Sequence, residues 1–162
     1  MAEKLTPKIP AGRLSLAEVA PQQLAAMLRL ERSIDLDRRL RDLVALRASQ
    51  LNACAFCLDM HYKDARAAGE SEERLYLLDA WRESPGYSER ERAALELCEA
   101  MTLLTDGHVP DAVWERAEAA FEREELAQLV FAIVSINAWN RLNVTTRLEP
   151  GHYQPGAFAA AA

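Results

Sequence analysis

The chain has 162 residues, of which 50% are hydrophobic and 27% charged, the ordinary balance of a globular protein of one domain. Its net charge of −6, with acidic and basic residues interleaved, excludes the basic footprint of a nucleic-acid-binding protein. No stretch approaches the ~20 unbroken apolar residues of a membrane span, and residues 1–9 lack the apolar run of a secretory signal.

The chain contains three cysteines, two of them closely spaced. An odd number is a poor disulfide framework for a secreted protein, whereas in a reducing compartment the same pattern indicates redox or metal chemistry. We therefore expect a cytoplasmic protein with neither a membrane nor nucleic acid among its partners.

Apolar residues follow helical spacing through almost the whole chain. Pro21 opens a first helix, which the pair at 34–35 breaks. A second helix is predicted from about 36 to 51. Asn52 is then expected to be the N-cap of the next helix, which Gly69 ends.

Cap signals continue in the second half of the chain. Ser71 caps a further helix, and Ser88 with Glu91 has the capping-box spacing for the one after it. The last helix, from about 123 to 143, is apolar nearly all round over 126–136, which is typical of the centre of a bundle or of a subunit contact.

No strand-like alternation of useful length and no glycine-rich phosphate loop interrupt this pattern. The sequence therefore predicts an all-α helical bundle without a β-sheet. We expect one domain over 1–162, with a core at about 14–147 and an extended tail over 148–162, whose closing alanines carry no structural signal.

Cys54, Cys57 and His61 stand at helical spacing on one predicted face. In the first turn of the helix Cys54 gains most from the exposed backbone N–H groups, which stabilise a thiolate. Cys57 gains most from the imidazole four residues further on. The residues thus support either sulfur as the attacker, and an unequal pair of thiols is what a peroxide-reducing cycle needs, because one forms a sulfenic acid and the other condenses with it.

Asp42 is a candidate partner for His61. If the two helices fold back as an antiparallel pair about 51–52, both residues lie ~14 Å from the turn and come level. A carboxylate there would orient His61 and drain its proton, directly or through water. The alternative is a solvated charge in the run 37–42, since helical charges mostly lie at the surface.

Two other readings of the cysteine pair are open. Both cysteines could be buried small hydrophobes without chemistry. Alternatively, Cys54, Cys57, His61 and Asp42 offer four ligands to zinc. Structural zinc sites more often have a second ligand pair elsewhere, and the remaining candidates stand apart: His108, His152 and Cys98. Cys98 lies on an apolar stripe and is expected in the core.

Two segments resemble a known family. The segment 41–61 resembles the core of the alkylhydroperoxidase D-like (AhpD-like) proteins of the carboxymuconolactone decarboxylase superfamily, and 136–144 resembles their final core helix. The resemblance runs over about 14–147. It implies an all-helical peroxidase that reduces hydroperoxides, including alkyl ones, to alcohols through a Cys-x-x-Cys disulfide.

The resemblance also implies roles for residues. It assigns Cys57 as the peroxidatic sulfur that becomes a sulfenic acid, and Cys54 as the resolving thiol and proton donor. His61 matches the family histidine of the proton relay, and Asp42 stands where the family usually has Glu, one methylene longer. Asn140 is expected to be structural. No cofactor other than the Cys54–Cys57 disulfide, and no metal, is implied.

By the same resemblance, the partners are a hydroperoxide substrate and an electron donor, either a dithiol such as lipoamide or a thioredoxin-like protein. The family assembles as trimers or hexamers, so a homo-oligomer is expected. Two alternative functions remain. One is a lactone decarboxylase like the namesake of the superfamily, whose members lack the redox cysteine pair, and the other is a non-catalytic redox or zinc-binding sensor.

Overall fold

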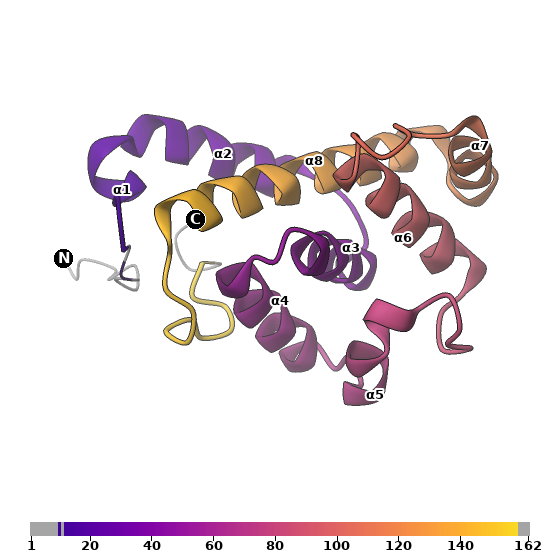
Figure 1. Ribbon diagram of the computed structural model, residues 1–162, viewed down its shortest axis with the longest axis horizontal. Helices are drawn as coiled ribbons and strands as arrows, with labels where there is room; N and C mark the ends of the chain where they lie inside the picture. Colours follow the sequence, from indigo (N-terminus) through magenta and orange to yellow (C-terminus); the bar gives the residue numbers. More distant parts are fainter. Residues whose placement is uncertain (1–9, 11, 159–162) are drawn as a thin grey trace.

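The computed structural model describes residues 10 and 12–158, and within these it contains eight α-helices, one 3₁₀ helix and no β-sheet (Figure 1). The elements, in chain order, are α1 (Leu16–Val19), α2 (Pro21–Ser33), α3 (Arg38–Leu51), α4 (Ala55–Ala67), α5 (Glu72–Tyr76), the 3₁₀ helix η1 (Leu78–Ala80), α6 (Glu89–Thr102), α7 (Asp111–Ala120) and α8 (Arg123–Thr146). The predicted all-α class is confirmed.

Helix α3 is the centre of the molecule. In Figure 1 it is seen nearly end-on, and α4, α6 and α8 all pack against it. Every residue over 43–49 is buried, so this part of the helix has no face toward solvent. A helix buried on all sides has to be surrounded by others, and α3 carries the chain from this buried position directly into the cysteine motif.

The predicted caps of two helices are confirmed. The Ser71 side chain accepts from the backbone N–H of Arg74 at the start of α5, and Ser88 forms the reciprocal capping box with Glu91 at the start of α6. Both are local patterns that need no tertiary contact to form. Pro21 begins α2 as predicted, whereas the short α1 was not expected.

Helix α8 is longer and less evenly buried than predicted. It continues to Thr146, where Arg147 takes a left-handed conformation and ends it. Leu129 and Ile133 are fully buried against the core, but Phe131 is 51% and Val134 46% exposed. Together with α6 and α7, α8 forms the walls of a largely apolar groove of about 580 Å³.

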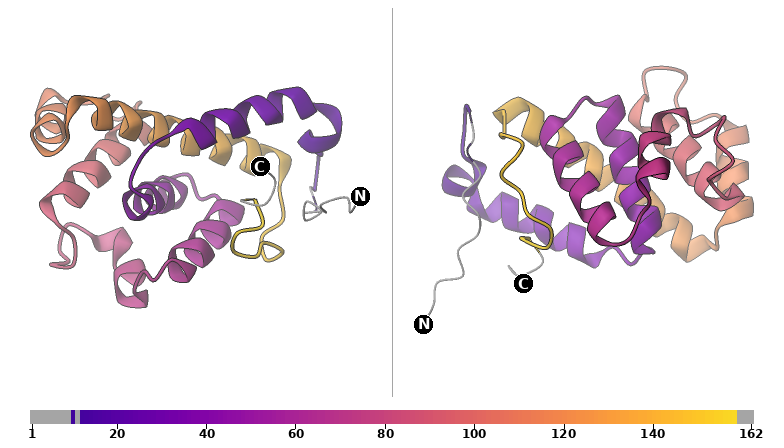
Figure 2. Two further views of the ribbon diagram at one scale, coloured as in Figure 1. Left: turned by 180° about the vertical axis from the view of Figure 1, so that it is seen from behind. Right: turned by 90° about the horizontal axis from the view of Figure 1, so that it is seen from below.

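The C-terminal tail, expected to be extended, is held against α4 (Figures 1 and 2). Tyr153 is 2% exposed, and its hydroxyl donates to the carboxylate of Asp64 at 2.8 Å. Lys63 Nζ donates to the carbonyl of Tyr153 at 3.0 Å, and the Gly151 N–H donates to Asp59 at 2.9 Å. The last part of the tail, the alanines at 159–162, lies outside the described residues. None of the described helices is long and apolar enough to cross a membrane.

Candidate redox site

The turn between α3 and α4 differs from the prediction. Asn52 is the C-cap of α3 rather than the N-cap of α4, and Cys54 occupies the N-cap of α4 with an extended backbone (φ −87°, ψ 96°). Ala53 between them has a φ of 51°, in the left-handed region. The prediction was wrong because three residues, not a single junction, make the turn, which moves Cys54 from the first helical turn to the helix end.

This turn brings the two sulfurs together in the core. Both cysteines are free and 1% exposed, and their Sγ atoms are 2.7 Å apart. A disulfide bond is ~2.05 Å long, so closing one requires a shift of less than about 1 Å. The motif predicted from spacing is therefore a contacting dithiol, and this is the geometry that reversible disulfide formation needs.

The two thiols differ in acidity. The hydrogen bond between the two sulfurs is the largest of the effects that lower the pKa of Cys54, to about 7. The backbone N–H groups of Cys57 and Phe56 and the side chain of Asn140 act in the same direction, against burial. The same bond, burial and the negative charge on Cys54 raise the pKa of Cys57. At neutral pH the thiolate therefore lies on Cys54 and the proton on Cys57.

Two asparagines of α8 complete the surroundings of the sulfurs. Asn143 donates from Nδ2 to the Cys57 Sγ at 3.3 Å, and Asn140 is 1% exposed and lowers the pKa of both thiols. Asn140 was predicted to be structural, and no role was predicted for Asn143. Their signal was present: Asn137, Asn140 and Asn143 follow one another at three-residue spacing in the second half of this helix, so they lie close to one another on its surface.

His61 is partly buried on α4, one turn beyond Cys57. Burial lowers the pKa of its imidazole to about 4, so it is neutral at neutral pH. The charges that act on it come from Glu31, Asp64 and Arg41. None of the hydrogen bonds among the described residues joins His61 to a sulfur, and its role beside Cys57 stays a prediction.

Glu31 is a residue that the sequence analysis missed. It projects from α2 and accepts hydrogen bonds from Ser135 of α8 and from the guanidinium of Arg41 on α3. Burial raises the pKa of Glu31, but these bonds outweigh it and hold the pKa below the usual value. Glu31 is thus a fixed anion beside His61, and α2, α3 and α8 together build its site.

Asp42 does not lie level with His61. Its carboxylate is 3.7 Å from the guanidinium of Arg38 and lines a small cavity with Ala65 and Ala68, beyond His61 on α4. The reason is the three-residue turn, which starts α4 later than the count from 51–52 assumed. Burial raises the pKa of Asp42 to about 6, so the ionised carboxylate destabilises the folded protein. Its relay role stays a prediction.

Replacing Asp42 by Asn is expected to stabilise the protein at pH 7 by about 2 kcal/mol. The pKa of this carboxyl is about 6 in the folded protein against a usual 3.8, so folding is penalised fully above pH 6, where the group is ionised in both states. The penalty disappears below about pH 4, where both states are protonated. Urea denaturation should therefore show curves that separate at pH 7 and converge at pH 4.

The matched control is Asp106→Asn, at an exposed carboxylate in the turn after α6. It should leave stability within about 0.5 kcal/mol of the original protein at both pH values. A gain from Asp42→Asn that persists at pH 4 would contradict the electrostatic explanation and point to packing instead.

Cys98 lies in the core as predicted. It is fully buried, its thiol donates to the carbonyl of Val44 at 3.3 Å, and burial raises its pKa to about 12. The ligand set considered for zinc is not gathered. Within residues 10 and 12–158, no group of three or more His, Cys, Asp and Glu side chains is arranged to hold a metal ion.

Known proteins are similar to this chain in sequence and in fold. Residues 20–100 match the model of the carboxymuconolactone decarboxylase family. The uncharacterized protein YdfG of Bacillus subtilis is 42% identical over 82% of the chain and 92% of its own length. A crystal structure of a protein of unknown function from Agrobacterium tumefaciens, for which a role as the antioxidant defence protein AhpD has been suggested, is 39% identical. The match covers 86% of this chain and 97% of the Agrobacterium chain, with a TM-score of 0.83.

The fold also occurs with other chemistry. The debrominase Bmp8 has a TM-score of 0.75 at 19% identity, with 88% of the chain and 76% of its own covered. A variant of it in which a cysteine is replaced by alanine has been crystallised with a tribromopyrrole. At this identity the likeness concerns the fold alone.

Proposed function

Because the chain belongs to the carboxymuconolactone decarboxylase family, as an AhpD-like member, we propose that it is a thiol-dependent peroxidase that reduces hydroperoxides through a Cys54–Cys57 dithiol–disulfide cycle. The observation that carries the proposal is the contact of two buried sulfurs of unequal acidity at a helix N-terminus. A contacting pair of this kind supplies both the nucleophile and the group that resolves the oxidised product.

In the first step the Cys54 thiolate attacks one oxygen of the hydroperoxide. The O–O bond breaks, a Cys54 sulfenic acid forms, and the alkoxide that leaves takes the proton of the adjacent Cys57 thiol to become the alcohol. Cys57 is the group placed for this transfer, because its sulfur lies 2.7 Å from that of Cys54 and keeps its proton at neutral pH.

In the second step the new Cys57 thiolate attacks the Cys54 sulfur. The S–S bond forms, the S–O bond breaks, and hydroxide leaves as water after taking up a proton. His61, which is neutral at neutral pH, would carry this proton, and Asp42, which does not lie level with it, would take part only through water. A dithiol or a thioredoxin-like donor then restores both thiols by disulfide exchange.

This order reverses the one that the family resemblance implies, in which Cys57 attacks first. The support for the reversal is the acidity of the pair, since the thiolate is the nucleophilic form of a cysteine and Cys54 is the more acidic. Both orders end in the same disulfide.

Thiol counting by mass spectrometry tests the proposal directly. The reduced protein is treated with one equivalent of tert-butyl hydroperoxide, and its cysteines are alkylated under denaturing conditions. A Cys54–Cys57 disulfide with Cys98 still free is the expected product, together with one equivalent of tert-butanol. Free thiols at both Cys54 and Cys57 after full exposure to the peroxide would overturn the proposal.

The rate of disulfide formation should rise with pH through about 7. Because only the Cys54 thiolate reacts and its pKa is about 7, the rate falls about tenfold per pH unit below that value and levels off above it. Stopped-flow measurement with tert-butyl hydroperoxide checks the profile. A midpoint near the usual value of 9.0 would mean that the hydrogen bonds at Cys54 do not set its reactivity.

The family's namesake activity remains the competing function. A lactone decarboxylase would not require the sulfurs, so lactone turnover that persists when both cysteines are serine would favour it. An oligomer of three or six chains and a cytoplasmic location remain predictions from the resemblance and from the cysteine pattern.

A further inference from the structure

We infer that the side-chain amides of Asn140 and Asn143 are catalytic donors that stabilise the thiolate on whichever sulfur carries it. We also infer that a buried chain of hydrogen-bonded amides fixes the orientation of the Asn140 side chain. The inference rests on the proposed function for its place in a cycle, but the acidity that it assigns to each sulfur is measured without any peroxide. Nothing in the family match assigns these roles.

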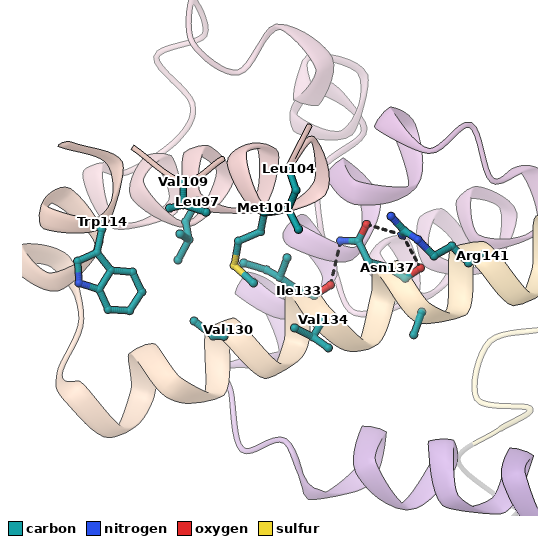
Figure 3. Close-up of a pocket in the computed structure, with 11 residues that line it drawn as sticks. Leu97, Met101, Leu104, Val109, Trp114, Val130, Ile133, Val134, Asn137 and Arg141 are labelled. Atoms are coloured by element: carbon teal, nitrogen blue, oxygen red, sulfur yellow. Dashed lines mark hydrogen bonds between the residues drawn. The ribbon is translucent and has the colours of Figure 1, made fainter. Parts of the chain in front are cut away.

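The chain of amides begins at Arg141. Its Nη1 donates to the Oδ1 of Asn137 at 3.0 Å, a bond drawn in Figure 3. A guanidinium has no acceptor, so the atom that faces it must be the amide oxygen. The Nδ2 of Asn137 donates to the carbonyl of Ile133 at 3.0 Å, and a carbonyl is an acceptor only. The orientation of Asn137 is therefore determined at both ends.

Asn52 links the amide of Asn137 to the amide of Asn140 and so determines the orientation of the second. Its Nδ2 donates to the Oδ1 of Asn137 at 3.0 Å and to the Oδ1 of Asn140 at 2.9 Å, which uses both of its hydrogens. The oxygen of Asn140 must then face Asn52. Its Nδ2 is left to face the other side, where it donates to Ser49 Oγ at 3.0 Å and lies beside the sulfurs.

Burial prevents the Asn140 amide from turning to the opposite orientation. Asn140 is 1% exposed, so flipping its amide would place its NH₂ group against the NH₂ group of Asn52, two donors with no acceptor or water between them. The consequence is a donor, and never an acceptor, presented to the Cys54–Cys57 pair. This is the polarity that favours a thiolate.

Asn143 acts on the second sulfur at 3.3 Å. In the resting dithiol the negative charge on Cys54 holds the proton on Cys57. Once Cys54 is a sulfenic acid, that charge is gone, and the Asn143 amide stabilises the Cys57 thiolate that must attack next. One helix thus supplies a donor for each of the two steps.

The groups that face the sulfurs come from three helices. The other sulfur and the backbone N–H groups of α4 contribute, as do Asn140 and Asn143 on α8 and, through Asn140, Ser49 on α3. The charged pair Glu31 and Arg41 acts on His61, and neither residue is among the main influences on the pKa of either thiol.

The test is a pH titration of thiolate ultraviolet absorbance, which needs no reagent to enter the core. In a Cys54→Ser background, a neutral stand-in for the oxidised sulfur, adding Asn143→Leu should raise the midpoint of Cys57 by about one pH unit, a tenfold change in acidity. In the protein with both cysteines, Asn52→Leu, which frees the Asn140 amide to turn, should raise the midpoint of Cys54 similarly.

Thr145→Val is the matched control, a polar-to-apolar exchange at an exposed position of the same helix, and it should move neither midpoint. Asn143→Gln, which keeps an amide donor, should raise the Cys57 midpoint by less than Asn143→Leu does. Helicity by circular dichroism confirms that each variant folds. If Asn143→Leu folds and leaves the Cys57 midpoint unchanged, or Asn52→Leu leaves that of Cys54 unchanged, the assignment is overturned. Absence of peroxidase activity would instead count against the proposed function alone.

Discussion

Replacing either Cys54 or Cys57 by serine is expected to lower hydroperoxide turnover by at least about 10³-fold. Without Cys54 the pair loses the sulfur that is ionised at neutral pH, and without Cys57 the sulfenic acid has no thiol within bonding reach. Both defects stop the cycle, so the two single variants and the double variant should be almost equally inactive. Turnover is measured with tert-butyl hydroperoxide and dithiothreitol as electron donor.

The control for this experiment is Cys98→Ser. Cys98 is fully buried on α6, and its raised pKa keeps it protonated, so turnover should stay within about twofold. Trapping with dimedone separates the two orders of attack. Sulfenic acid that accumulates on Cys54 in Cys57→Ser supports attack by Cys54, whereas rapid trapping only on Cys57 in Cys54→Ser would restore the order that the resemblance implies.

Local signals in the sequence predicted most of the fold. The capping box of Ser88 with Glu91 and the start of α2 at Pro21 follow from neighbouring residues alone, and both are confirmed. The start of α4 is not local in this sense. It depends on Ala53 taking a φ of 51°, which is unusual for alanine, and on the Cys54 N–H bonding back to the Ser49 carbonyl at 3.0 Å. Asn52 is a good N-cap by type, but the turn uses its side chain elsewhere.

The parts of the site that were missed come from distant segments. Glu31 reaches His61 from α2, and the order of residues along α3 and α4 gave no sign of it. Asn143 lies 86 positions from Cys57 in the chain. By contrast, the cysteine pair was found because both sulfurs belong to one helix start, where spacing alone determines which side chains meet.

Removing Arg47 is expected to cause the largest loss of stability among the polar residues of α3. Arg47 is buried, and its Nε donates to Glu99 on α6 at 2.7 Å. Burial raises the pKa of Glu99, but bonds from Trp81, Arg82 and Arg47 outweigh it and keep this carboxylate ionised. Arg47→Ala leaves the charge with fewer donors and opens a cavity between α3 and α6. The free energy of unfolding should fall by about 3 kcal/mol, measured by urea denaturation at pH 7.

A double-mutant cycle separates the ion pair from the packing. The cycle uses Arg47→Met and Glu99→Gln alone and combined. Glu99→Gln alone leaves Arg47 with only the exposed Asp79 as a charged partner, and the double variant removes both buried charges while retaining most of the volume. The double variant should therefore recover part of the loss, because it contains no buried charge without a partner. Strictly additive losses would contradict coupling between Arg47 and Glu99. Since neither side chain is among the main influences on Cys54, its pKa should stay near 7 in every variant that folds, which distinguishes an effect on the bundle from an effect on the redox site.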